Sequence, residues 1–309
     1  MRHRPLGRTG LTVSEIGFGC ASYWGLRRFP EREALGLVHR AIDLGITLFD
    51  TAPGYSRGEA EPRLGRALGG RDRDRLVIAT KAGTFHAGGG RMGRDFAPAA
   101  IVASVEASLR RLGLEHLDIV QLHGPAAAEL TDDLFEAFAG LRARGLVRAF
   151  GANSFDPAVL SAVIECEAFD LVMLDYNVLR PERAPLVARA AALGKGVLAG
   201  MPLAMGHVDQ QIGKVRGPRD LWYAARALKN HRREVGQGAR FGFLRDLPDM
   251  SAAQAALAYV LADPGVACAV TGTTRREHLE ANAAASGLAL PEAVMARIRA
   301  VQAELARTS

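Results

Sequence analysis

The chain has 309 residues, of which 49% are hydrophobic and 23% charged, and its formal net charge is +6. This composition excludes disordered and collagen-like chains, and the length suits two small domains or one large α/β barrel. The basic residues are scattered and only 6% of residues are aromatic, which argues against a nucleic-acid partner, because such proteins gather basic side chains and aromatics on one element.

Eight strand-like runs alternate with helical stretches along the chain. Between the runs, apolar residues recur at helical spacing, as at Ala34, Leu37, Val38 and Ala41. Repeated strand-then-helix order predicts a parallel sheet, and eight such units close a (β/α)8 TIM barrel. We therefore expect a single barrel domain over residues 1–309. The predicted strands are Ile16–Gly19, Thr47–Asp50, Leu76–Thr80, Leu117–Leu122, Val147–Gly151, Leu171–Leu174, Gly196–Ala199 and Val266–Thr271.

Local signals between these runs favour the barrel over its rival. Asp156 and Pro157 are typical of an N-cap and a first helical position, so a helix is expected to begin there. The rival fold, a doubly wound open sheet, would carry G-x-G-x-x-G between its first strand and the next helix. The nearest match, Gly194–Gly200, leads from a helix into a strand and has the wrong spacing.

Two stretches interrupt the alternation. From Gly206 to Met250 the sequence predicts no strand, only a helix near Asp220–Glu234 and a stretch rich in glycine and arginine. A long insertion after a barrel strand lies at the C-terminal mouth, so we expect a lid or substrate loop after the seventh strand. The shorter loop Ala82–Ala97 is expected to form part of the rim.

The cysteines and the N-terminus predict a cytoplasmic location. Cys20, Cys166 and Cys268 are odd in number, widely spaced and without a C-x-x-C pattern, which argues against a disulfide framework and a zinc site. No apolar run follows the basic N-terminus, so no secretory signal is predicted. No uninterrupted apolar stretch approaches the ~18 residues of a membrane span, so no membrane partner is expected.

Polar residues end three consecutive predicted strands. Asp50, Lys81 and His123 close the second, third and fourth strands, and Tyr55 lies in the loop after Asp50. In a barrel such residues point into the mouth. Asp50 has an alternative role as a loop cap, Tyr55 as rim packing and His123 as a core histidine. Lys81 is harder to explain structurally, because a lysine that closes an apolar strand must find an anion or lose its charge.

Together these four residues suit proton transfer. An ordinary tyrosine has a pKa near ~10, and a lysine ammonium beside the phenol lowers that pKa. We expect Asp50 to keep Lys81 charged and His123 to hydrogen-bond the substrate oxygen. Such a set can give a proton to a developing alkoxide or take one from an alcohol, which predicts a small-molecule carbonyl or alcohol as the substrate.

In these stretches the sequence resembles the aldo-keto reductase superfamily. The resemblance implies a barrel that binds NADP(H) without a Rossmann domain and transfers hydride between nicotinamide and a carbonyl carbon. The family's catalytic tetrad carries over as Asp50, Tyr55, Lys81 and His123, with Tyr55 as general acid or base. The opening residues 5–19 are similar to the family's N-terminal hairpin and first strand. Further matches, in family order, are Gly45–Tyr55, Ile78–Lys81, Leu117–His123, Val147–Phe155, Pro202–Gly206 and Gly272–Asn282.

The resemblance also implies nicotinamide and pyrophosphate contacts, with departures from the family pattern. Asn153 and Ser154 stand in reverse order where the family holds the carboxamide, Met173 replaces a glutamine, and Gly200 stands where an aromatic often stacks. With a small residue at Gly200, the chain resembles the bacterial sugar-dehydrogenase-like branch of the family at this position. The departures at Met173 and Gly200 leave open a lyase or dehydratase, and the resemblance to some relatives leaves open a non-catalytic nicotinamide-binding regulatory subunit. The implied pyrophosphate support is Met201, Pro202, Leu203 and Gly206.

A helix start after the eighth strand is the expected phosphate site. The free N–H groups and positive dipole end of a helix favour an anion, and an arginine fork suits a 2′-phosphate. The alternative is a capped, solvent-exposed helix start. We expect the former, and therefore NADP(H) over NAD(H). The residues concerned are Gly272, Thr273, Thr274, Arg275, His278 and Asn282.

Aromatic residues on the loops are the remaining candidates for substrate contact. Trp24 follows the first strand, and Trp222, Tyr223, Phe241 and Phe243 lie in the long insertion. Such residues can build an apolar wall for a ring or sugar face, or they can pack the loops onto the barrel. We expect Trp24 to touch the substrate together with Tyr55 and His123.

Overall fold

Eight parallel strands close into a barrel in the computed structural model, which describes residues 1–89, 91–204 and 236–307. Around the barrel the strands follow chain order, and the last pairs with the first. The predicted (β/α)8 fold is therefore confirmed. The strands are β3 (Ile16–Gly19), β4 (Leu48–Asp50), β5 (Val77–Ala82), β8 (Leu117–His123), β9 (Val147–Asn153), β10 (Leu171–Leu174), β11 (Gly196–Ala199) and β12 (Cys268–Thr271).

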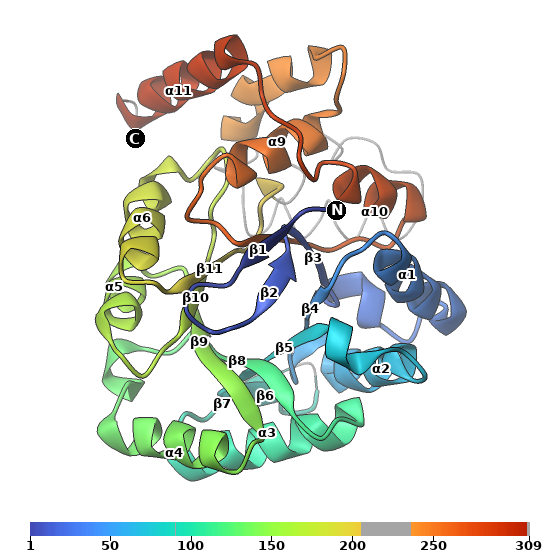
Figure 1. Cartoon of the computed structure of the whole chain (residues 1–309), viewed down its shortest axis with the longest axis vertical. Helices are drawn as coiled ribbons and strands as arrows, with labels where there is room; N and C mark the ends of the chain where they lie inside the picture. Colours follow the sequence, from blue (N-terminus) through green and yellow to red (C-terminus); the bar gives the residue numbers. More distant parts are fainter. Residues whose placement is uncertain (90, 205–235, 308–309) are drawn as a thin grey trace.

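Helices surround the strands (Figure 1). The α5 helix begins as predicted, with Pro157 in its first turn and the carboxylate of Asp156 accepting the Ala158 N–H at 2.9 Å. None of the described helices is both long and apolar enough to cross a membrane. The helices are α1 (Glu31–Asp43), α2 (Ala60–Leu68), α3 (Pro98–Leu112), α4 (Asp132–Ala143), α5 (Pro157–Glu165), α6 (Ala184–Ala192), α9 (Ala252–Leu261), α10 (Arg276–Ala283) and α11 (Glu292–Arg307).

An N-terminal hairpin closes one end of the barrel. Strand β1 (His3–Pro5) pairs antiparallel with β2 (Thr12–Ser14), and the hairpin lies across the ring of strands in Figure 1. Leu6 from its turn joins the cluster of side chains inside the barrel. Gly7 permits the close approach, because a Cβ at this position would lie 2.3 Å from the backbone nitrogen of Gly196. This end is therefore filled, and the carboxyl ends of the strands remain for a functional site.

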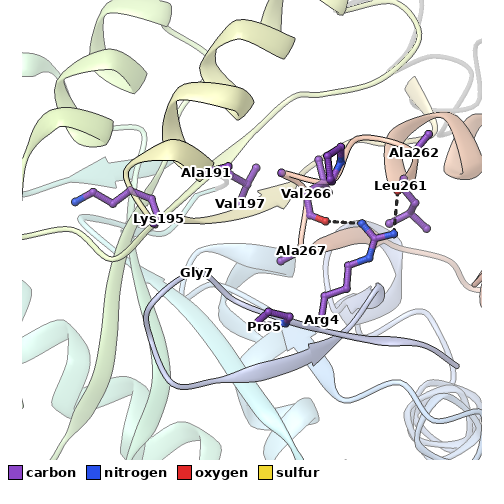
Figure 2. A pocket seen from close by; sticks show the side chains of 13 residues that line it. Arg4, Pro5, Gly7, Ala191, Lys195, Val197, Leu261, Ala262, Val266 and Ala267 are labelled. Carbon is purple, nitrogen blue, oxygen red and sulfur yellow. Dashed lines mark hydrogen bonds between the residues drawn. The ribbon is translucent and has the colours of Figure 1, made fainter.

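A hollow of about 480 Å³ lies beside the hairpin. Figure 2 shows Arg4 reaching into it, where the guanidinium donates to the carbonyl oxygens of Leu261 and Val266 at 2.9 Å each. Arg4 also pairs with the buried carboxylate of Glu15 at 3.0 Å. The hollow lies at the amino ends of the strands, and the charge of its arginine is already paired, so it is separate from the mouth where chemistry is expected.

The loops contain one element that the sequence did not predict. The expected rim Ala82–Ala97 contains a second hairpin, formed by β6 (Thr84–His86) and β7 (Met92–Arg94). In the insertion after β11, the predicted helix near residues 220–234 lies outside the described residues, as do Trp222 and Tyr223. The described remainder includes a 3₁₀ helix, Ala239–Asp246, in which Phe241 is buried in the main core. Phe241 therefore packs the insertion and lines no open wall.

Candidate active site

Asp50 and Lys81 form a buried ion pair at the mouth of the barrel. Alternate residues of a barrel strand face its interior. Leu48 and Ala79 belong to the interior cluster, so Asp50 and Lys81, each two residues further along, also point inward. Lys81 Nζ lies 2.8 and 2.6 Å from the two carboxylate oxygens of Asp50 and 3.0 Å from the carbonyl oxygen of Thr51.

The surroundings of this pair keep the lysine protonated. Burial alone would lower the pKa of Lys81, but the charge of Asp50, the phenol of Tyr55 and hydrogen bonds to both raise that pKa above its ordinary value. Burial raises the pKa of Asp50, and Lys81 and Gln121 offset part of this rise. The result is a fixed positive charge below the mouth, held by a carboxylate that solvent does not reach.

Tyr55 lies over this charge. Its ring centroid is 4.9 Å from Lys81 Nζ and 5.6 Å from the ring of His123, at an interplanar angle of 87°. The two residues that follow it, Ser56 and Arg57, have φ of 56° and 64°. Side chains at such left-handed positions cost about 1–2 kcal/mol each, and strain of this kind gathers at functional sites. The chain therefore turns sharply just after the phenol.

His123 is uncharged in this site. Burial, and then the charge of Lys81, lower the pKa of His123 to about 3. Its Nδ1 lies 2.6 Å from the hydroxyl of Thr84 on β6. The imidazole at neutral pH is therefore neutral, with one ring nitrogen held by the hairpin. Asp50, Tyr55, Lys81 and His123 thus lie together as the sequence predicted, with direct contacts from Lys81 to Asp50 and Tyr55.

Gln121 also belongs to the site, although it was not predicted from the sequence. It is fully buried on β8, and its Nε2 donates to Asp50 Oδ1 at 3.1 Å. Its Oε1 has no hydrogen-bond partner among the described residues. The signal that could have found it is strand alternation, since Gln121 stands two residues before His123 and so faces the same interior.

The residues expected near a nicotinamide lie on the next strands around the barrel. Asn153 ends β9, and its side-chain amide donates to the Met173 carbonyl at 3.4 Å. The hydroxyl of Ser154 accepts the Asp156 N–H at 3.1 Å. Met173 is buried among the interior side chains, and a Cβ at Gly200 would lie 3.3 Å from its methyl carbon. The thioether therefore fills the space next to Gly200.

The segment after β11 has an unusual backbone at the expected pyrophosphate support. Met201 has φ of 48°, and its carbonyl accepts from the side-chain amide of Asn177 at 3.1 Å. Pro202 is buried and Leu203 is half-buried. Gly206 lies outside the described residues. Asn177 thus holds the backbone of this segment, a role that was not predicted from the sequence.

The turn that leads into α10 is the place where the sequence predicts an anion site. Thr273 Oγ1 accepts the backbone N–H of Arg275 at 3.1 Å, which orders the turn that leads into the helix. Thr274 and Asn282 are buried, Arg275 and His278 are half-buried, and Gly272 is exposed. The first N–H groups of a helix have no partner within it, so this turn offers donors of the kind that a phosphate accepts.

These residues fit a nicotinamide dinucleotide. Among the described residues, the side-chain oxygen of Asn153 accepts no hydrogen bond, so an acceptor is available at the mouth for a carboxamide N–H. The donor-rich start of α10 follows β12, on the far side of β11 from β10. One end of the site thus has an acceptor for an amide N–H, and the other has donors that a phosphate can accept from.

Trp24 was predicted to contact the substrate, but its side chain lies in the core. Its side chain is 1% exposed, packs edge-on against Phe18 and donates to the Ala34 carbonyl at 3.1 Å. The guanidinium of Arg63 holds the Trp24 carbonyl at 2.6 Å. The prediction that Trp24 touches the substrate is therefore wrong, because its indole ring packs in the core and its N–H is hydrogen-bonded there.

Known proteins are similar to this chain in sequence and fold. A family model described as the aldo/keto reductase family matches residues 15–303. The oxidoreductase YqkF of Bacillus subtilis is 33% identical over 293 residues, which covers 91% of this chain and 90% of YqkF. D-threo-aldose 1-dehydrogenase of a Pseudomonas species is 29% identical, with 94% of each chain covered. The holo form of AKR11C1 from Bacillus halodurans matches with a TM-score of 0.79 at 29% identity, covering 97% of this chain and 96% of that one.

Proposed function

Because this chain belongs to the aldo/keto reductase family, we propose that it is an NADP(H)-dependent oxidoreductase that interconverts an aldehyde or ketone with the corresponding alcohol. One observation carries the proposal. A protonated Lys81, held by Asp50 at 2.6–2.8 Å, lies under the ring of Tyr55, with the neutral His123 beside it.

Tyr55 is the proposed general acid and base. A nearby ammonium stabilises a phenolate, so Lys81 makes it easier for Tyr55 to give its proton to the oxygen of a carbonyl substrate and to take it back from an alcohol. Asp50 and Gln121 hold Lys81 in place and do not reach the substrate oxygen in this proposal. A bound nicotinamide supplies or accepts the hydride at the carbonyl carbon.

His123 has a different proposed role. With a pKa of about 3, its imidazole is not in the imidazolium form at neutral pH and so does not act as the general acid. It can still donate one N–H to the substrate oxygen, where negative charge develops as the carbonyl is reduced. The proton itself therefore falls to Tyr55.

The proposed cofactor is NADP(H), held at three places. Asn153 and Ser154 would bind the carboxamide, and the backbone of Met201–Leu203 would support the pyrophosphate. Arg275, together with the turn ordered by Thr273, would bind the 2′-phosphate that distinguishes NADPH from NADH. The remaining contacts proposed for this part of the cofactor come from Gly272, Thr274, His278 and Asn282.

Two alternatives keep the same site without net redox chemistry. A lyase or dehydratase is motivated by Met173 and Gly200, which remove an amide and an aromatic ring from the expected nicotinamide pocket. A regulatory nicotinamide-binding subunit would have no use for a buried Lys81–Asp50 pair under Tyr55, because burying two charges is expensive. We therefore favour the oxidoreductase, and place it in a reducing cytoplasm, where free thiols persist.

The test is transfer of label from the cofactor. The purified protein is incubated with a panel of aldehydes, ketones and sugars and with NADPH that carries deuterium at the transferable position, and products are identified by mass spectrometry. A deuterium on the former carbonyl carbon of any product supports the proposal. Conversion of a substrate without label would indicate the lyase, and cofactor binding without conversion would indicate the regulatory subunit.

A further inference from the structure

The β6–β7 hairpin makes a direct contact with the candidate active site. Thr84, the first residue of β6, places its hydroxyl 2.6 Å from Nδ1 of His123, 39 positions further along the chain. The hairpin is anchored to the barrel strand that carries Lys81, since it begins two residues after β5 ends and is closed by the hydrogen bond from Asp95 N to Gly83 O at 2.9 Å. Thr84 therefore reaches His123 from a folded element and not from an irregular loop.

The same hairpin packs against the segment that carries Tyr55. A Cβ at Gly54 would lie 2.2 Å from the methyl carbon of Met92 on β7, so the side chain of Met92 packs directly against the residue before Tyr55. The hairpin thus contacts both the Tyr55 segment and His123. A shift of the hairpin would move the Thr84 hydroxyl relative to the imidazole.

The chemistry of the contact depends on which nitrogen of His123 carries the proton. A neutral imidazole has one N–H donor and one acceptor nitrogen, and a hydroxyl can serve as partner to either. If Nδ1 carried the proton, it would donate to Thr84, and the hydroxyl proton would have no acceptor among the described residues. If Thr84 donates to Nδ1, both the hydroxyl proton and the Nδ1 lone pair are used. Donation by Thr84 is therefore the arrangement in which both groups of this contact have a partner within the described part of the chain.

We propose that Thr84 is a positioning residue that fixes His123 in the tautomer with its proton on Nε2. The ring then presents an N–H donor, and not a lone pair, to the oxygen of the substrate. The opposite tautomer would place a lone pair against the developing alkoxide and repel it. This inference rests on the proposed function for its catalytic consequence, but the tautomer itself is a property of the protein alone.

The tautomer can be measured without any substrate. In ¹⁵N-histidine-labelled wild-type protein at neutral pH, the ring nitrogens of His123, assigned by their loss in His123→Asn, should report a proton on Nε2 and a hydrogen-bonded lone pair on Nδ1. In Thr84→Val, which keeps the shape and loses the hydroxyl, the spectrum should shift toward a mixture of tautomers. Thr84→Ser keeps the hydroxyl and should restore the wild-type spectrum. A proton on Nδ1 in the wild type would overturn the inference, whether or not the valine variant folds.

Kinetics then connect the tautomer with the reaction. Loss of a neutral hydrogen bond is worth about 1 kcal/mol, so kcat should fall by roughly five- to tenfold in Thr84→Val and recover in Thr84→Ser, with NADPH affinity unchanged. A wild-type rate in Thr84→Val, with an unchanged spectrum, would refute the role of Thr84 while carbonyl reduction stands. If no variant or wild type reduces any carbonyl but the spectra change as expected, the proposed function fails and the tautomer assignment holds.

Discussion

Separating the Lys81–Asp50 pair should destabilise the protein far more than removing it whole. At an effective dielectric of ~20, unit charges 2.6–2.8 Å apart attract by roughly 6 kcal/mol, while burying each ion costs several kcal/mol. Lys81→Met or Asp50→Asn leaves one buried charged partner without its counter-ion, and either should lower the free energy of unfolding by about 3–5 kcal/mol. The double variant leaves no charge and should lose much less than the sum of the two.

Urea unfolding of the four proteins measures this coupling directly. The midpoints and slopes give the free energies, and their double-mutant cycle gives the interaction between the two residues. Lys195→Met is the matched control, because this half-buried lysine donates to the backbone carbonyls of Cys166 and Phe169 and has no carboxylate partner among the described residues. Additive losses at Lys81 and Asp50 would refute the view that the two side chains form one buried ion pair.

Three further outcomes follow from other parts of the structure. The pKa of His123 is about 3 in the folded protein and 6.5 ordinarily. Between these pH values the unfolded chain binds a proton at His123 that the folded protein does not bind. As the pH falls below ~6.5, the free energy of unfolding should therefore decrease by up to about 1.4 kcal/mol per pH unit on account of this group. Urea midpoints of wild type and His123→Asn at pH 7 and pH 4.5 check this, and equal acid sensitivity would contradict it. Arg275→Ala should weaken NADPH by roughly ten- to a hundredfold in fluorescence titrations and leave NADH almost unchanged, whereas equal losses would mean that Arg275 supports the helix. Arg57→Gly should raise the free energy of unfolding by up to about 1 kcal/mol, because it relieves a φ of 64° at an exposed position, and a loss of stability would argue that its side chain has a structural role.

The barrel and the central pair could be predicted because they depend on local patterns. The eight strands follow from apolar runs in a regular order, and strand alternation places Asp50 and Lys81 on the interior face together with Leu48 and Ala79. Asp50 and Lys81 end neighbouring strands, so their meeting follows from strand order alone. Strand alternation also places Gln121 inside, although its polar character between apolar neighbours gave no sign of its partner.

Contacts between segments far apart in the chain could not be predicted in the same way. The bond from Thr84 to His123 depends on a hairpin that closes between β5 and α3, and the glycines at its turn indicated only a loop. The prediction for Trp24 was wrong because its sequence position shows only that it follows the first strand. The sequence does not show that its indole N–H donates to the Ala34 carbonyl, or that Arg63 binds its backbone carbonyl. The direction of a loop side chain depends on such distant partners.

Replacement of Tyr55 by phenylalanine isolates the hydroxyl that is proposed to transfer the proton. Tyr55→Phe removes only this hydroxyl, so we expect NADPH-dependent carbonyl reduction to fall by roughly 10²–10⁴-fold, with NADPH affinity close to that of the wild type. Tyr259→Phe is the control and should keep its activity, because the hydroxyl of Tyr259 accepts from Gln302 at 3.0 Å and belongs to none of the proposed substrate or cofactor contacts. If Tyr55→Phe reduces carbonyls within a few-fold of the wild-type rate, Tyr55 is not the general acid of the reaction.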